Sequence, residues 1–184
     1  MSVVVFAALL AATGVMRLVE LAVSVRRMRA DRSAVVAEPG LFPLMALLHL
    51  AFVTLPLLEV VAFARPFSWA IAAPALAVLA GATALRVWTL RTLGRSWNVR
   101  VVRPPVVATG GPYRWIRHPN YLVVILEIAA LPLVHAAWLA AAALTLANAA
   151  VLWRRIRTEE ASLSTIPEWV AAMGTKARFV PGIF

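Results

Sequence analysis

Long apolar runs, separated by short breaks and by arginines, constrain this chain more than any other feature of its sequence. A helix needs about 20 mostly apolar residues to cross the hydrocarbon core of a bilayer. Three runs reach that length, and two shorter ones flank a break at Pro132 and His135, which predicts a tight helical hairpin. About five transmembrane helices are therefore expected. Their approximate bounds are residues 2–25, 41–64, 69–90, 120–134 and 136–153.

The composition also favours a membrane protein over a soluble one. The chain has 184 residues, the length of one domain, and is 62% hydrophobic and only 14% charged. A soluble domain is nearer half apolar and one quarter charged. Because this chain has too few polar residues to cover a water-facing surface, we expect a single all-α, polytopic membrane domain over residues 1–184.

The net charge of +10 comes mainly from arginines in the loops between the apolar runs. Residues 26–32, 91–118 and 154–157 are rich in arginine, whereas the remaining loops hold only Arg65 and His135. The positive-inside rule then predicts an N-terminus outside and the arginine-rich loops in the cytoplasm, in a bacterial membrane if the arginine and alanine bias reflects a GC-rich genome. Basic residues that flank membrane spans do not indicate nucleic-acid binding.

The residue types available limit the possible chemistry. The chain has no cysteine, which excludes disulfides, thiolate catalysis and cysteine metal sites. Its three histidines are isolated in the sequence, so we expect no metal site. We expect His49 to be packed or to line a pore rather than to bind a ligand.

Charged and aromatic residues near the apolar runs carry further expectations. Charges within a membrane are costly and are usually paired or functional. Glu20 is expected to pair with Arg17, three residues away, and Glu59 is expected to reach water near the outer end of its helix. Trp88 and Trp97 are expected to anchor the chain at the membrane interface.

The most informative polar segment covers residues 110–121. Its Gly-Gly-Pro sequence predicts a tight turn, and Pro119 suits the first turn of the next helix, where its missing N–H is not needed. A helix start offers free N–H groups that can hold a carboxylate, and His118 and Tyr121 add donors there. The alternative is a membrane-interface belt of tyrosine, tryptophan and arginine anchors.

A second polar segment, residues 154–160, follows the last apolar run. Arg155 and Glu159 are four residues apart and therefore share one face of a helix. On its own this pair is equally consistent with a solvated salt bridge of little energetic value.

The two segments together resemble a known family. The pattern G-P-Y-R-x-x-R-H-P-N-Y, an apolar hairpin and then R-R-I-R-T-E-E is similar to the isoprenylcysteine carboxyl methyltransferase family and to the related phospholipid N-methyltransferases. These are membrane enzymes that use S-adenosylmethionine. The resemblance covers residues 93–163, the expected catalytic region, and implies a cofactor pocket built from loops and helix ends at the cytoplasmic face.

The resemblance also implies roles for individual residues. Arg155 corresponds to a substrate-side arginine and is a candidate catalytic residue, together with His118. Apart from the resemblance, Glu127 is a charge in the middle of an apolar run, two turns after Tyr121, and is for that reason a candidate substrate-binding residue. The tail at 166–173 lacks the spaced tyrosines of the family and has Trp169 as its only aromatic residue. The expected cofactor-binding residues are Val106, Val107, Ala108, Thr109, Tyr113, His118, Pro119, Asn120, Tyr121 and Glu159.

The expected reaction transfers a methyl group to a carboxylate or phenolic oxygen of a hydrophobic, lipid-like acceptor, such as a prenylated acid or an alkyl phenol from a polyketide pathway. A carboxylate needs no general base, whereas a phenol requires one, for which His118 or a nearby carboxylate is the candidate. Membrane lipids surround the protein, and no obligate protein partner is inferred.

Two other functions remain open from the sequence. One is an NADPH-dependent membrane reductase with a sterol-reductase-like architecture, in which Arg154, Arg155 and Arg157 would hold the extra ribose phosphate. The other is a lipid-binding membrane protein without catalytic activity.

Overall fold

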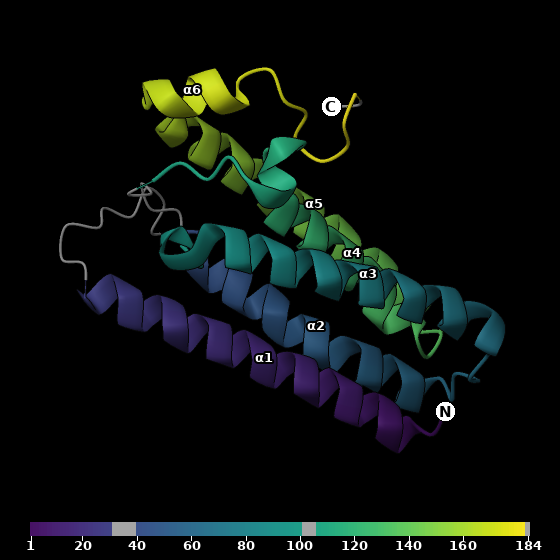
Figure 1. Cartoon of the computed structure of the whole chain (residues 1–184). Helices are drawn as coiled ribbons and strands as arrows, with labels where there is room; N and C mark the ends of the chain where they lie inside the picture. Colours follow the sequence, from purple (N-terminus) through teal and green to yellow (C-terminus); the bar gives the residue numbers. More distant parts are fainter. Residues whose placement is uncertain (31–39, 101–105, 183–184) are drawn as a thin grey trace.

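A computed structural model describes residues 1–30, 40–100 and 106–182 (Figure 1). Parts of the two arginine-rich loops, residues 31–32 and 101–105, lie outside the described residues, as do residues 183–184 of the tail. The described chain is all-helical, as predicted. Its elements are α1 (Val3–Ala30), α2 (Phe42–Ala62), α3 (Trp69–Leu93), η1 (Gly94–Ser96), η2 (Gly111–Arg114), α4 (Pro119–Leu133), α5 (Trp138–Leu163) and α6 (Pro167–Met173).

Four of the described helices are long and apolar enough to cross a membrane: α1, α2, α3 and α5. The fifth predicted span, α4, is also apolar but has only 15 residues. At 1.5 Å per residue it extends about 22 Å, which is shorter than a hydrocarbon core of about 30 Å. Helix α5 continues ten residues beyond its predicted end at 153, so it carries Arg155 and Glu159 past its most apolar part.

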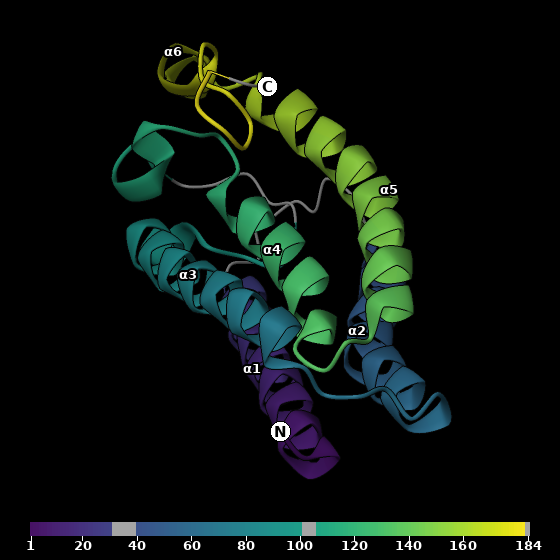
Figure 2. The ribbon, with the colours of Figure 1, turned by 90° about the vertical axis from the view of Figure 1, so that its right-hand side faces the viewer.

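The helices form a bundle in which α4 lies between α3 and α5, with α1 and α2 below them in the view of Figure 2. Helix α1 packs on α2, and α2 packs on α5. The N-terminus and the turns at 63–68 and 134–137 share one end of the bundle, whereas η2, α6 and the C-terminal tail gather at the opposite end (Figure 1). We call the latter the arginine-rich end.

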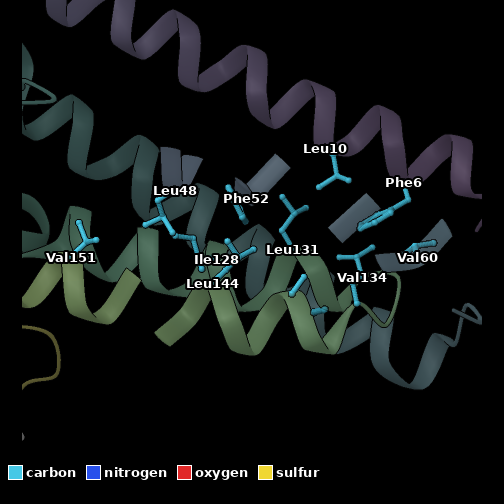
Figure 3. Packing of buried hydrophobic residues seen from close by; sticks show 13 residues of the cluster. Phe6, Leu10, Leu48, Phe52, Val60, Ile128, Leu131, Val134, Leu144 and Val151 are labelled. Carbon is cyan, nitrogen blue, oxygen red and sulfur yellow. The ribbon is translucent and has the colours of Figure 1, made fainter. Parts of the chain in front are cut away.

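The half of the bundle near the N-terminus is closed by apolar side chains (Figure 3). Phe6 and Leu10 of α1 are fully buried against Phe52 of α2 and Leu131 of α4. Because lipid is as apolar as these side chains, they stabilise the bundle through van der Waals packing between helices and not through removal from water. Because this half is filled, any space for a ligand must lie toward the arginine-rich end.

Glu59 departs from the sequence-based expectation. Its side chain is buried and does not reach water. The carboxylate accepts hydrogen bonds from the backbone N–H groups of Leu139 (3.2 Å) and Ala140 (2.6 Å) and pairs with Arg65 at 2.9 Å. The first N–H groups of a helix have no hydrogen-bond acceptor inside the helix. The Glu59 carboxylate of α2 is the acceptor for two such groups of α5.

Four charged side chains form a closed, largely buried ring between α1, α3 and α4. Arg17 pairs with Glu20 at 2.6 Å, as predicted, and with Glu127 at 2.7 Å. Arg86 pairs with the same two carboxylates, at 2.9 Å for Glu20 and 2.6 Å for Glu127. The ring has no net charge, which is how charges within a membrane protein are usually tolerated.

Candidate active site

A glycine turn positions the loop that precedes α4. Gly111 has φ +52°, in the left-handed region, and a Cβ atom there would lie 2.2 Å from Oγ1 of Thr92. Only glycine allows η2 to approach the end of α3 this closely. Beside this contact, Trp88 and Trp115 pack edge to face at 5.6 Å. Pro119 then occupies the first turn of α4, as predicted.

The C-terminal tail fixes His118 from two sides. The backbone N–H groups of Arg117 and His118 donate to the carbonyl oxygens of Ala177 (2.9 Å) and Arg178 (3.0 Å). Glu160 of α5 lies 3.0 Å from Nε2 of His118 and 2.8 Å from Nη2 of Arg178. The start of α4, the end of α5 and the tail are thereby held together by one carboxylate.

The start of α4 and the end of α5 line a small polar cleft at the arginine-rich end together with α6, and its volume is about 110 Å³. Two of the predicted cofactor-binding residues, Thr109 and Pro119, do not line it. Burial and the negative charge of Glu159 raise the pKa of the Tyr113 hydroxyl above its usual value, so this group remains a proton donor at neutral pH. The predicted residues that line the cleft are Val106, Val107, Ala108, Tyr113, His118, Asn120, Tyr121 and Glu159.

Three buried polar atoms of residues that line the cleft have no hydrogen-bond partner among the described residues. They are Nε1 of Trp97, Nε of Arg117 and Oδ1 of Asn120. Buried polar atoms are nearly always paired, so each such exception requires an explanation. These two donors and one acceptor would suit a ligand that has both hydrogen-bond acceptors and hydrogen-bond donors.

A second cavity, of about 400 Å³, lies beside the polar cleft and is mainly apolar. This volume is within the range of about 300–1,000 Å³ that is typical of small-molecule sites. Leu18 of α1 and Leu50 of α2 line the cavity, yet their exposed fractions are 66% and 62%. The apolar cavity therefore opens to the outside of the bundle along these two membrane-spanning helices.

The polar cleft and the apolar cavity share part of their lining, which we call the shared wall. Arg155 is its best-connected member. Its Nε donates to the Tyr121 hydroxyl at 2.7 Å, and its Nη1 contacts the sulfur of Met45. Nη2 donates to the carbonyl oxygen of Val99. The shared wall consists of Trp97, Asn98, Asn120, Tyr121 and Arg155.

The Tyr121 hydroxyl connects the two residues that the sequence placed on one helix face. It accepts from Arg155 and donates to the carboxylate of Glu159. The His118 ring stacks on that of Tyr121 at 5.3 Å. Tyr121 and Arg155 thus face both spaces, whereas His118 and Glu159 face the polar cleft alone.

Two expectations from the sequence differ from this geometry. Glu127 lines neither space, because its carboxylate is turned into the charge ring with Arg17 and Arg86. The expectation that Trp97 is an interface anchor is wrong, since its ring is buried in the shared wall. A tryptophan after an arginine-rich helix end fits an interface anchor by sequence alone, and its burial depends on contacts with distant segments.

Sequence reasoning missed two further residues of the site. Glu160 organises His118, and its only sequence signal was its place next to Glu159. Trp169 of α6 is buried and lines the polar cleft with Met173. It occupies the tail in which the spaced tyrosines of the resembling family are absent, and as the only aromatic residue there it could have been nominated.

Comparisons with known proteins agree with the sequence patterns. The sequence model of the isoprenylcysteine carboxyl methyltransferase (ICMT) family matches residues 75–165. "Uncharacterized protein YpbQ" of Bacillus subtilis (strain 168) is 35% identical over 125 residues. That alignment covers 66% of this chain and 73% of the relative. The matched region extends from α3 to the end of α5 and so contains most of the polar cleft.

Proposed function

Because this chain belongs to the isoprenylcysteine carboxyl methyltransferase family, whose members are S-adenosylmethionine-dependent carboxyl methyltransferases, we propose that it methylates a carboxylate or phenolic oxygen of a hydrophobic acceptor. The observation that carries the proposal is the shared wall, where a polar cleft meets an apolar cavity open along α1 and α2. A water-soluble cofactor and a lipid-like acceptor need two such spaces that meet at one point.

The polar cleft suits the donor and acceptor groups of S-adenosylmethionine. Nε1 of Trp97 and Nε of Arg117 are buried donors without a partner in the part of the chain that the structure describes, and they suit a carboxylate. Oδ1 of Asn120 and the carboxylate of Glu159 suit an ammonium group and hydroxyls. When bound, S-adenosylmethionine supplies a methyl group whose bond to sulfur breaks, leaving the electron pair on sulfur, as its bond to the acceptor oxygen forms.

Arg155 is the residue that we assign to the acceptor oxygen. Its Nη1 faces the sulfur of Met45, which is a weak hydrogen-bond acceptor. An anionic oxygen would replace that contact with a stronger, charge-assisted hydrogen bond. The bonds of Arg155 to Tyr121 and Val99 hold the guanidinium in place before the acceptor arrives, which reduces the entropy lost on binding.

The position of His118 bears on how a phenol would lose its proton. The ring lines only the polar cleft, and its Nε2 lies against Glu160. No histidine among the described residues belongs to the shared wall. We therefore propose that the acceptor oxygen reacts as an anion stabilised by Arg155, with the phenolic proton, where there is one, lost to water or to the Glu159 carboxylate through Tyr121.

We further propose that the arginine-rich end faces the cytoplasm and the N-terminus faces outward. The turns at the N-terminal end hold Arg65 and His135, whereas the arginine-rich end holds most of the remaining basic loop residues. This distribution supports the orientation through the positive-inside rule. The cofactor would then reach the polar cleft from the cytoplasm.

The reductase alternative receives less support. It requires arginines that converge on a ribose phosphate, yet Arg155 is buried in the shared wall. Arg157 lies over the ring of Trp153 at 5.5 Å, on the exposed side of α5. The two guanidinium groups therefore lie in different environments and do not converge on one phosphate site.

Thermal unfolding of the purified protein in detergent, with and without ligands, tests the cofactor assignment. S-adenosylmethionine and S-adenosylhomocysteine should raise the Tm, since a ligand at 100 times its Kd stabilises the folded state by about 2.7 kcal/mol. Glu159→Gln should weaken cofactor binding about tenfold or more. The matched control is Glu168→Gln on the exposed face of α6, which should not change it.

Two other results would contradict the cofactor assignment. Stabilisation by NADPH but not by S-adenosylmethionine would favour the reductase. A folded protein that responds to neither cofactor would favour the lipid-binding alternative without catalysis.

A further inference from the structure

One polar atom of the apolar cavity is not used by the proposed methyl transfer: Nε2 of His49 in α2. His49 lines the cavity, and its Nδ1 lies 2.7 Å from the carbonyl oxygen of Met45. Because a carbonyl oxygen only accepts hydrogen bonds, Nδ1 carries the proton and Nε2 of the neutral ring is an acceptor. Among the described residues, no donor contacts Nε2.

The charged side chains near His49 already bind one another. Arg17, Glu20 and Arg86 also line the cavity, and each is held in the buried ring by two ion pairs. Arg17, Arg86 and Arg155 are near enough to His49 to act on it electrostatically. Because the charge ring is neutral, the charge that remains near the imidazole is that of Arg155, which disfavours a cationic ligand there and leaves a neutral donor, such as a hydroxyl, as the suitable partner.

Helix geometry relates His49 to the reacting end of the cavity. Met45 and His49 are four residues apart in α2 and therefore lie on one face, with about 5–6 Å between their Cβ atoms. The sulfur of Met45 contacts Nη1 of Arg155, where the acceptor oxygen is expected to bind. His49 thus follows Arg155 by about one helical turn toward the N-terminal end.

We propose that the apolar cavity recognises an acceptor with a second hydroxyl, which donates a hydrogen bond to Nε2 of His49 while the oxygen that is methylated binds Arg155. We call this position at Nε2 of His49 the hydroxyl site, and it rests on the proposed function for the identity of its ligand. The substrate class that it implies is a hydrophobic compound with two oxygens at a fixed spacing. His49 acts here as a specificity residue and does not touch the cofactor.

Binding of two matched probes to the cofactor-free protein tests this site. The probes are 3-pentadecylphenol and 5-pentadecylresorcinol, which have the same alkyl chain and differ by one meta hydroxyl. Quenching of tryptophan fluorescence can report binding, because Trp97 belongs to the shared wall. Comparing the ratio of the two Kd values between protein variants cancels the partition of the probes into detergent.

Wild-type protein is expected to bind the resorcinol about tenfold more tightly than the phenol, since one hydrogen bond in a dry site contributes about 1–1.5 kcal/mol. His49→Leu should reduce that ratio to the statistical factor for two equivalent hydroxyls. His49→Gln, which keeps an acceptor atom at a similar reach, should retain most of the preference. Asn148→Leu is the matched control, because Asn148 also lines the cavity but lies two turns from Arg155 along α5.

Equal affinity for the two probes in the wild type would overturn the proposal, as would a preference that His49→Leu leaves unchanged. A preference that disappears in Asn148→Leu but persists in His49→Leu would also overturn it, by placing the second hydroxyl deeper in the cavity. Methyl transfer to the probes is measured separately. A His49-dependent binding preference without any methylation supports the hydroxyl site and counts against the proposed function alone.

Discussion

The polar cleft and the apolar cavity lie side by side but are built in different ways. The cleft is formed by loops, by α6 and by the ends of α4 and α5, and its lining includes buried polar atoms without partners among the described residues. The cavity is formed by α1, the first half of α2, α4 and α5, and three of its charged residues, Arg17, Glu20 and Arg86, are paired within the charge ring. The difference indicates that the cleft selects its ligand by polar contacts and the cavity by shape and apolar area.

The shared wall is therefore the one part of the site that must serve both ligands. Arg155 and Tyr121 belong to it, and their hydrogen bonds reach Glu159 on the cleft side and Met45 on the cavity side. Substitutions in the wall should affect both ligands. Substitutions on one side should affect only one ligand.

The largest effect is expected for Arg155→Gln in the shared wall. Removing a charge-assisted hydrogen bond from a water-poor site costs about 1.5–3 kcal/mol, so kcat/KM should fall about 100-fold. Because Arg155 lines both spaces, the Kd values of cofactor and acceptor should both rise. The measurement is methyl transfer with titration of each substrate.

Arg157→Gln is the matched control for Arg155→Gln. Arg157 lies two positions further along α5 and contacts the exposed ring of Trp153 rather than the shared wall. Activity of this variant should remain within about twofold of wild type, as expected for a surface substitution. Equal losses in the two variants would contradict the position assigned to Arg155.

A smaller effect, confined to the acceptor, is expected for Ala46→Phe. Ala46 of α2 lines the apolar cavity, so the added ring should fill part of the space and raise the acceptor KM about tenfold. The cofactor Kd should not change. Leu47→Phe is the control, because Leu47 points outward from the same helix with 61% exposure and does not line the cavity. A rise in the cofactor Kd of Ala46→Phe would show that the two spaces are not independent.

The parts of this site that could be predicted from the sequence depend on local patterns. The apolar runs and the breaks at Pro132 and Pro66 determine where helices lie, and the i, i+4 spacing places Arg155 and Glu159 on one face. Glu20 also finds Arg17 within its own helix. Each of these relations spans a few residues, so the periodicity of a helix is enough to reveal it.

The parts that could not be predicted depend on contacts between distant segments. Trp97, Asn120 and Arg155 meet in the shared wall although they lie in a loop and two different helices. Glu59 was expected to reach water but is buried, because α5 begins beside it and presents free N–H groups. The carboxylate of Glu127 likewise pairs with Arg17 and Arg86, which lie in other helices. No pattern within one segment contains this information.

The smallest effect is expected for Trp169→Leu, on the cleft side. Trp169 packs with Leu163, Ile166 and Met173 and lines the polar cleft, opposite the start of α4. Replacing the indole with a smaller apolar side chain keeps the packing of α6 but removes part of the cleft lining, so the cofactor Kd should rise about fivefold, or about 1 kcal/mol. The acceptor KM should stay constant. Val170→Ala, on the exposed side of the same helix, is the control. If Trp169→Leu lowers the Tm without changing the cofactor Kd, Trp169 only supports α6, and the cleft selects its ligand without the tail.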